Sequence, residues 1–370
     1  MFFNLSLGFI LTAVLVGAIT WLVRKIAVFF RIFDYPANPR KVHERPTPLL
    51  GGVAVFAGLF IVLFLFVVLA PQSLVGHYLQ LKQLIGVFIG GLILVVGGIL
   101  DEKYNLKPSH QMVFSIAAVL AVIACGVGVR EITNPFGGLS AGEAGTISLV
   151  SWEKTLFWWH GTAYRLSLPA DLITFIWLLV IIYTTKFLDG LDGLVSGITV
   201  IGALTVAFLA TLTKWYQPEV ALMSVIVAGA FLGFLFWNWH PAKIFLGNSG
   251  STLAGFLLGV LAIISGSKIA TTLLVLGVPV LDVAWVVGRR IFWEKKSPAQ
   301  ADRKHLHFRL LDIGFSHRGA VLFLYLVSAL FGVAALFLQS KEKLIALAIL
   351  GAFMVGLAVF AIGWRRSNRV

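Results

Sequence analysis

The sequence predicts an all-α polytopic membrane protein, in which about eleven transmembrane helices form a single domain over residues 1–370. Composition is the first observation: 59% of the 370 residues are hydrophobic, 12% are charged, and the mean hydropathy is +0.95. Soluble domains are about a quarter charged and just under half apolar. The second observation is that apolar stretches long enough to cross a hydrocarbon core of roughly 30 Å recur along the chain. The third is the distribution of Lys and Arg between alternate connecting segments.

The apolar stretches give the expected helices in chain order. They lie at 6–23, 49–70, 83–100, 111–129, 170–185, 194–212, 219–237, 250–266, 269–288, 319–338 and 343–364. The first stretch lacks a small-residue cleavage site, which favours a retained helix over a signal peptide. Because eleven is an odd number, the two chain termini are expected on opposite sides of the membrane.

Positive charge indicates which side each connecting segment faces. With the N-terminus outside, 21 of the 29 Lys and Arg residues fall in inner segments and 8 in outer segments. Lys and Arg accumulate in the cytoplasmic loops of membrane proteins. We therefore expect an outer N-terminus and a cytoplasmic C-terminus, and the net charge of +13 needs no nucleic acid to explain it. The single cysteine, Cys125, lies in an apolar run and cannot form an internal disulfide.

Two connecting segments are long. Residues 130–169 are expected to form an extracytoplasmic loop, in which the stretch ISLV is compatible with a short strand. Its aromatic cluster, Phe157, Trp158 and Trp159, is typical of an anchor at the membrane interface. Residues 289–318 are expected to form a cytoplasmic basic loop.

Polar segments converge on the inner side of this predicted topology. Ten of the 16 acidic residues lie on that side. Five unusual segments adjoin helix ends there: 33–52, 101–106, 186–193, 240–251 and 301–316. Their common location predicts a cytoplasmic active-site cleft.

The stretch LDGLDGL carries the most informative acids, Asp189 and Asp192. If residues 188–194 are helical, the two carboxylates lie on one face and repel each other unless a cation lies between them. Such hard oxygen ligands favour Mg²⁺ or Mn²⁺. Gly190 and Gly193 would allow close approach of a ligand. The alternative is a helix start with Asp189 as its N-cap, and the spacing alone does not decide between the two.

Two further motifs have simple alternatives. Asp101 and Glu102 end an apolar run, and taken alone they are best interpreted as an exposed pair that Lys103 neutralises. The stretch GNSGS opens a helix and could present free N–H groups to phosphate. Its alternative is ordinary capping by Ser249 or Ser251.

The stretch DRKHLH combines basic residues with two histidines. Zinc is improbable here, because no cysteine lies nearby and a third ligand is not evident. An anion site built from Arg303, Lys304, His305 and His307 is more plausible, and the alternative is a juxtamembrane stretch that contacts anionic lipid. Acidic metal ligands, phosphate-binding turns and basic residues on one membrane face together indicate phosphoryl chemistry at the membrane surface.

At these motifs the sequence resembles the polyprenyl-phosphate N-acetylhexosamine-1-phosphate transferases, which include the phospho-MurNAc-pentapeptide translocase. The matching motifs are D-x-P-x-x-x-R-K-V-H-x-x-P-T-P-x-x-G-G at 34–52, TNPFGG, LDGLDGL, F-x-G-x-S-G-S and DRKHLHFRLLDIGFS. They occur in the family's order and spacing, over about residues 34–316. The pattern DRxHxH with TNPFGG is similar to the GlcNAc-1-phosphate branch.

The resemblance implies a reaction in which undecaprenyl phosphate attacks the β-phosphorus of a UDP-sugar, giving lipid-diphosphate-sugar and UMP, with Mg²⁺ as cofactor. It also implies a multi-pass protein of the bacterial inner membrane that starts the synthesis of a cell-envelope glycan. Carried over to this chain, the catalytic acids are Asp101, Glu102, Asp189 and Asp192. The metal ligands are Asp189, Asp192 and Asn248, and the substrate-binding residues are Arg45, Lys186, Asn248, Ser249, Arg303, His305 and His307.

Four positions differ from the family's pattern. Glu102 stands where a second Asp is usual, Lys186 where Asn is common, Asn248 where an acid implicated in metal binding is usual, and Phe308 where a third histidine is found. Loss of a carboxylate at position 248 should weaken Mg²⁺ binding, although an amide oxygen can still coordinate. We hypothesise that Lys186 supplies positive charge near the diphosphate and offsets part of that loss.

These differences keep two other functions open. The first is a degenerate member of the family that binds the UDP-sugar or the lipid without turnover. The second is a secondary transporter, which glycine-interrupted helices would suit, although the charges cluster at one face rather than at the midplane. The sequence leaves open the UDP-sugar, the glycan polymer and the assembly, for which a homodimer is one option.

Overall fold

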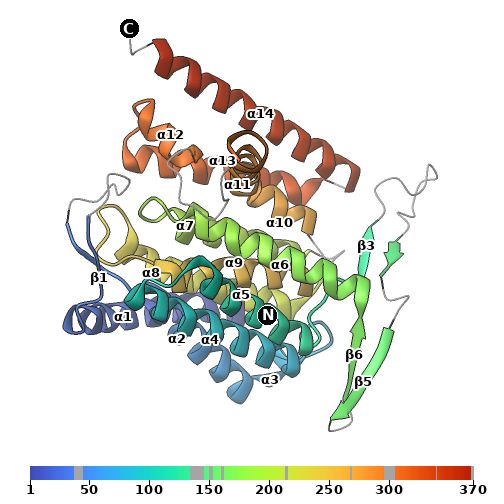
Figure 1. The fold of residues 1–370 in the computed structure, drawn as a ribbon. Helices are drawn as coiled ribbons and strands as arrows, with labels where there is room; N and C mark the ends of the chain where they lie inside the picture. Colours follow the sequence, from blue (N-terminus) through green and yellow to red (C-terminus); the bar gives the residue numbers. More distant parts are fainter. Residues whose placement is uncertain are drawn as a thin grey trace.

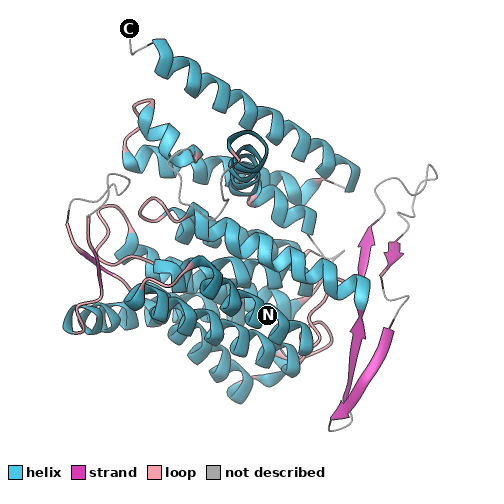
Figure 2. Cartoon of the chain, in the orientation of Figure 1, coloured by secondary structure: helices cyan, strands magenta, loops and turns pink. Residues whose placement is uncertain are grey.

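Long apolar helices make up most of the chain, with short antiparallel strand pairs at their ends (Figures 1 and 2). The computed structural model describes residues 1–36, 45–133, 146–149, 153–159, 162–212, 216–266, 269–295, 305–338 and 340–367. The helices are α1 (Phe2–Phe29), α2 (Gly51–Leu69), α3 (Pro71–Leu74), α4 (Leu81–Tyr104), α5 (Pro108–Ala124), α6 (Leu168–Leu188), α7 (Leu194–Thr211), α8 (Pro218–Asn238), α9 (Gly247–Ile264), α10 (Ile269–Val275), α11 (Gly277–Arg289), α12 (Leu306–Asp312), α13 (His317–Phe337) and α14 (Ser340–Ser367). A π-helical turn, Arg290–Glu294, follows α11.

The prediction of a polytopic helical membrane protein is confirmed at this level. Within the described residues, eight helices are long and apolar enough to cross a membrane: α1, α2, α4, α6, α7, α8, α9 and α13. The expected span at 269–288 is instead a broken pair, α10 and α11, bent by 82°. α5 is a shorter apolar helix of 17 residues. The count of eleven therefore stays a prediction, because the stretches at 111–129, 269–288 and 343–364 are not straight helices that meet the same test.

The strand pairs mark the two ends of the helical bundle. β3 (Glu131–Thr133) pairs with β4 (Thr146–Ser148), and β5 (Glu153–Trp159) pairs with β6 (Thr162–Ser167). All four lie at one end of the bundle in Figure 1, whereas β1 and α12 lie at the other. β4 confirms a strand within the ISLV stretch, and the anchoring role of the aromatic cluster in β5 stays a prediction.

The end that carries β1 (Phe33–Asp34) also holds β2 (Thr47–Pro48), and the two strands pair antiparallel. The backbone N–H groups of Gly51 and Gly52, at the start of α2, donate to the carbonyls of Phe245 and Leu246, just before α9. This joins the segment after β2 directly to the beginning of α9.

α9 lies at the centre of the bundle and brings the polar segments together. Its residues from Ser249 to Ile264 are all buried, and it packs against α2, α4, α6 and α7. Two glycines allow this close packing at its N-terminal end. A Cβ at Gly52 in α2 would overlap the backbone of Gly250, and a Cβ at Gly98 in α4 would overlap that of Ser249. The first turn of α9 is therefore held against the end of α4 that carries the acids.

Candidate functional site

The first acid of the site, Asp101, is oriented by two side-chain amides. It lies in the last turns of α4, where Oδ1 accepts a hydrogen bond from Gln111 Nε2 at 2.6 Å. Its Oδ2 accepts one from Asn248 Nδ2 at 2.7 Å. A carboxylate has about four lone-pair positions, so Asp101 keeps acceptor capacity for a further group. Asn248 is thus linked to Asp101, and its own Oδ1 is not used in that bond.

Lys186 reaches Asp101 through Gln111. Its Nζ donates to Gln111 Oε1, while the amide nitrogen of Gln111 bonds to Asp101 and to the Leu106 carbonyl. Three of the positions predicted from sequence are therefore connected: Lys186, Asp101 and Asn248. The partly buried ammonium and the carboxylate attract each other electrostatically. The arrangement agrees with Lys186 as a positive charge of the site, a role that stays a hypothesis.

Glu102 is held by the N-terminal ends of two helices. Its Oε1 accepts from both the backbone N–H of Ser249 (3.0 Å) and the Ser249 hydroxyl (2.8 Å), and Oε2 accepts from the N–H of Leu50 (3.2 Å). The interpretation of Asp101 and Glu102 as an exposed loop pair is wrong. The interpretation of Ser249 or Ser251 as an ordinary cap is also wrong, because α9 has no side-chain capping bond and Ser251 donates to the carbonyl of Gly247. A carboxylate of the protein occupies part of the anion-binding position that a helix N-terminus offers.

Asp189 lies in a turn between helices. α6 ends at Leu188 and α7 begins at Leu194, after Gly193 with a φ of +80°. The prediction that 188–194 could be helical is wrong, and so is the alternative of Asp189 as an N-cap, because Asp189 is the C-cap residue of α6. A positive φ at Gly193 lets the chain reverse within five residues.

Asp189 is exposed to solvent in part, yet the surrounding protein encloses enough of its carboxylate to remove part of its hydration. This enclosure, followed by repulsion from Glu102 and Asp192, raises the pKa of Asp189 to about 8, while the Ser251 hydroxyl lowers it. Repulsion shows that Glu102, Asp189 and Asp192 share one electrostatic environment. A cation beside Asp189 would offset both the lost hydration and the repulsion.

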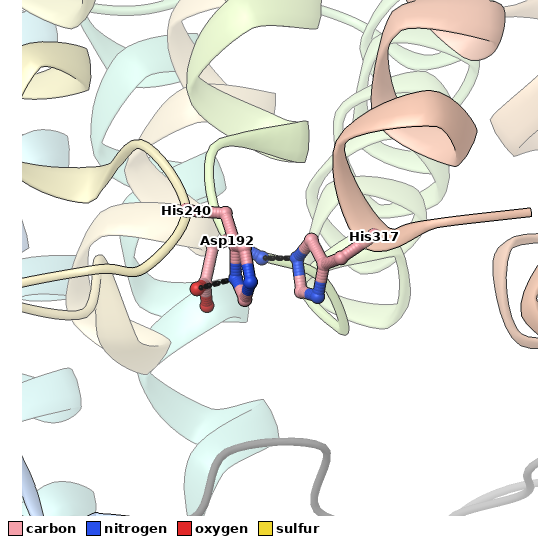
Figure 3. Close-up of side chains that lie close together, drawn as sticks. All are labelled: Asp192, His240 and His317. Atoms are coloured by element: carbon pink, nitrogen blue, oxygen red, sulfur yellow. Dashed lines mark hydrogen bonds and ion pairs between the residues drawn. The ribbon is translucent and has the colours of Figure 1, made fainter.

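Asp192 has a different environment, shown in Figure 3. Its Oδ2 accepts a hydrogen bond from His240 Nδ1 at 2.7 Å. The same oxygen accepts one from the N–H of Ala242 at 3.1 Å. Its own backbone N–H donates to His317 Nε2 at 2.9 Å. The Asp192 turn is thereby fastened both to the segment that follows α8 and to the first residue of α13.

The cluster of Asp192, His240 and His317 has the residue types of a metal site, with one ligand atom from each within 4.8 Å of the others. However, the two imidazole rings stack, with centroids 3.9 Å apart and planes only 14° from parallel. The lone pair of an imidazole nitrogen lies in the plane of its ring, so nearly parallel stacked rings cannot direct both lone pairs at one ion. The geometry therefore fits a hydrogen-bonded clamp better than a chelate.

The two loop histidines lie beside the Asp189 turn. His305 Nδ1 is 2.8 Å from Asp282 Oδ2, and both side chains are buried. His307 is 1% exposed, and neither of its ring nitrogens has a hydrogen-bond partner in the described part of the chain. Burial lowers the pKa of His307 to about 3, so its ring is neutral at physiological pH. A Cβ at Gly190 would overlap His307 Nε2, which places this nitrogen at the turn.

An unpaired N–H of a buried neutral imidazole costs about 1–3 kcal/mol, which indicates a hydrogen-bonding group that a ligand could supply. His307 is therefore the side chain that points most clearly to a substrate. Phe308, at the third-histidine position, has its ring near Gly190 and contacts His307.

The remaining predicted residues are less informative. Arg45 is exposed and lies two residues before β2, and Arg303 lies outside the described residues. Four residues with contacts in or beside the site were not predicted from the sequence: Gln111, His240, Asp282 and His317. Polar residues in or beside apolar helices were the available signal, but no spacing pattern connected them to the acids.

Comparison with known proteins places the chain in a family. The family described as "Glycosyl transferase family 4" matches residues 84–266. A Bacillus subtilis protein named "Probable undecaprenyl-phosphate N-acetylglucosaminyl 1-phosphate transferase" is 31% identical over 365 residues, which cover 97% of this chain and 91% of that protein. The chain belongs to the polyprenyl-phosphate N-acetylglucosaminyl 1-phosphate transferase family.

Two further relatives of this family extend the comparison. The Mycolicibacterium smegmatis "Decaprenyl-phosphate N-acetylglucosaminephosphotransferase" is 32% identical over 346 residues, covering 87% of this chain and 79% of that protein. The Escherichia coli K12 "Undecaprenyl-phosphate alpha-N-acetylglucosaminyl 1-phosphate transferase" is 27% identical over 319 residues, covering 83% and 76%. The similarity thus spans most of the chain.

Proposed function

We propose that the protein transfers GlcNAc-1-phosphate from UDP-GlcNAc to undecaprenyl phosphate at the cytoplasmic face of a bacterial inner membrane. The product, undecaprenyl-diphospho-GlcNAc, would be the first membrane-bound intermediate of a cell-envelope glycan. Family membership supports the reaction class. The observation in this chain that carries the proposal is the gathering of Asp101, Asn248 and Asp189 at the beginning of α9, with His307, unpartnered within the described residues, beside the Asp189 turn.

The proposed chemical step is direct displacement. An oxygen of the lipid phosphate attacks the β-phosphorus of UDP-GlcNAc, the bond from this phosphorus to the bridging oxygen breaks, and UMP leaves with that oxygen. A phosphate monoester has a second pKa near 6, so the lipid phosphate is largely dianionic at neutral pH and needs little help from a base. Asp101, oriented by Gln111 and Asn248, is positioned to take up a remaining proton. Covalent catalysis through an aspartyl phosphate is the alternative.

The difficult part of this reaction is to bring two anions together. Lys186 contributes a positive charge through Gln111, and His307 offers neutral hydrogen-bonding nitrogens beside the Asp189 turn. Mg²⁺, or Mn²⁺ in its place, would screen the phosphate charges and stabilise the transition state when bound.

The residues present fit such an ion. Burial, followed by repulsion from two neighbouring acids, raises the pKa of the Asp189 carboxylate, and a divalent cation would offset both effects. Asn248 can add an amide oxygen, since its bond to Asp101 uses only the amide nitrogen. Asp192 fits less well, because Oδ2 is already bonded to His240 and Ala242.

Purified protein with undecaprenyl phosphate and a panel of UDP-sugars tests the proposal, with UMP release as the readout. We expect release from UDP-GlcNAc that requires both the lipid phosphate and a divalent cation. Binding of UDP-GlcNAc without UMP release would contradict the transferase proposal and favour a substrate-binding member of the family. Uptake into proteoliposomes without UMP release would favour a transporter.

A further inference from the structure

A buried carboxylate on α11 holds the histidine loop at two adjacent points. Asp282 Oδ1 accepts a hydrogen bond from the backbone N–H of Leu306 at 2.8 Å, and Oδ2 is 2.8 Å from His305 Nδ1. Asp282 and His305 are 8% and 6% exposed. A buried carboxylate with both oxygens bonded to one dipeptide fixes that dipeptide in position as well as in orientation.

The hydrogen-bond chemistry also selects one form of the imidazole. An ionised carboxylate can only accept hydrogen bonds, so His305 Nδ1 carries a proton and donates it. Nε2 is then the nitrogen left for another molecule, and it has no hydrogen-bond partner within the described residues. In metal sites, the same division of roles between a carboxylate and the two nitrogens of a histidine orients the ring.

Ring contacts hold His305 from two other directions. Phe187, in the last turn of α6, stacks on it with centroids 6.1 Å apart and planes 19° from parallel. His307 stacks on it at 5.6 Å and 6°. Phe187 lies two residues before Asp189, so the position of His305 is set relative to the acid turn as well as to α11.

We infer that Asp282 is a positioning residue for the nucleotide-sugar subsite: it acts through His305, whose Nε2 it directs at the bound UDP-sugar. This inference rests on the proposed function, which supplies the substrate. Asp282 lies 23 residues before His305 in the chain, and both of its carboxylate oxygens are bonded to the protein. Its effect should therefore appear in the use of UDP-GlcNAc and not in the use of the lipid phosphate.

A double-mutant cycle with Asp282→Asn and His305→Ala tests the inference. An asparagine can keep its oxygen on the N–H of Leu306, but its amide nitrogen then faces Nδ1 and donates to it. The ring proton moves to Nε2, so the nitrogen left for the substrate becomes a donor instead of an acceptor. Alone, Asp282→Asn should lower kcat/KM for UDP-GlcNAc by about 10–100-fold, the range for loss of a carboxylate that orients a histidine. In the His305→Ala background, Asp282→Asn should lower kcat/KM for UDP-GlcNAc by less than about twofold, because the effects of coupled residues are not additive.

Asp171→Asn is the matched control. Asp171 also accepts a backbone N–H, that of Ser167 at 2.8 Å, but it lies at the end of α6 opposite to Phe187 and Asp189. The Asp171→Asn substitution should leave the KM for UDP-GlcNAc unchanged. Asp282→Glu keeps a carboxylate and should recover part of the activity that Asp282→Asn loses. Thermal unfolding of every variant reports folding separately, and if Asp282→Asn does not fold, Asp282→Glu enters the same cycle.

Three results would overturn the inference. The first is that Asp282→Asn lowers kcat/KM for UDP-GlcNAc equally with His305 present and with His305 replaced by alanine. The second is that Asp282→Asn raises the KM for undecaprenyl phosphate as much as the KM for UDP-GlcNAc. The third is an unaltered KM and kcat for UDP-GlcNAc in folded Asp282→Asn. Absence of UMP release by the unmodified protein would instead contradict the proposed function. The cycle is then measured from equilibrium binding of radiolabelled UDP-GlcNAc, where the same coupling is expected.

Discussion

The site has two acidic pairs, Asp101 with Glu102 and Asp189 with Asp192. In each pair, only one acid accepts hydrogen bonds from backbone N–H groups within the described residues. Backbone N–H groups bind the second acid of each pair: those of Leu50 and Ser249 bind Glu102, and that of Ala242 binds Asp192. Within the described part of the chain, neither Asp101 nor Asp189 accepts a backbone N–H. Asp101 is bonded to two side-chain amides instead.

This difference distinguishes acids that hold the fold together from acids that are available for catalysis. An acid that satisfies backbone N–H groups cannot move without leaving those groups unpaired. An acid held by side chains alone can exchange those partners for a metal ion or a substrate. We therefore expect Glu102 and Asp192 to shape the site and Asp101 and Asp189 to act in it.

The largest difference in activity is expected between substitutions of Asp189 and of Asp192. Asp189→Asn should reduce UMP release by about 10²–10³-fold, the loss typical for one preorganised electrostatic contact to a transition state. Its thermal stability should stay equal or rise, because the substitution removes repulsion from Glu102 and Asp192. Turnover and thermal unfolding are measured on the same preparations.

Asp192→Asn is the matched variant for that experiment. It should lower thermal stability, because His240 and Ala242 lose a charged acceptor, and reduce activity by less than Asp189→Asn does. The reverse order of activities, with both variants folded, would contradict the division of roles.

Removal of Glu102 should affect folding more than the affinity for either substrate. Glu102→Ala leaves the N–H groups of Leu50 and Ser249 without their acceptor, at about 1–3 kcal/mol for each group. Glu102→Gln keeps an acceptor oxygen and should cost less. Denaturant unfolding in detergent measures both, and a Glu102→Ala protein as stable as the parent would show that water or another group replaces the carboxylate.

Charge changes at Lys186 and Asn248 should shift the metal requirement. Asn248→Asp adds a carboxylate and should lower the Mg²⁺ concentration for half-maximal turnover by about tenfold, equivalent to roughly 1.4 kcal/mol. Lys186→Asn removes a positive charge linked to Asp101 and should lower activity at limiting Mg²⁺ more than at saturating Mg²⁺. Unchanged activity and metal dependence in Lys186→Asn would remove the compensation hypothesis.

The smallest expected effect is a pH dependence of the metal requirement. Without a cation the pKa of Asp189 is raised to about 8, so below pH 8 a metal ion has to displace a proton. The half-saturating Mg²⁺ concentration should therefore rise by up to about tenfold per pH unit as the pH falls below 8, and level off above it. A constant value between pH 6.5 and 9 would show that Asp189 is not the titrating ligand.

The sequence predicted the gathering of the polar segments, because alternating apolar spans and the Lys and Arg bias together assign each segment to one side. It could not predict how the acids divide their roles. Asp189 and Asp192 have different partners because residues 189–193 form a turn that ends at Gly193, whereas the same sequence is also compatible with a helix. Glu102 is fixed by α2 and α9, and Asp192 by His240 and His317, which are distant in sequence and meet only after the helices pack.

The most direct measurement is the location of Mn²⁺ by its anomalous X-ray scattering in crystals grown with UDP-GlcNAc. The predicted result is a single ion at the Asp189 carboxylate, with Asp192 still bonded to His240 and Ala242. An ion held by Asp192, His240 and His317, with Asp189 turned away from it, would contradict the assignment of separate roles to the two acids.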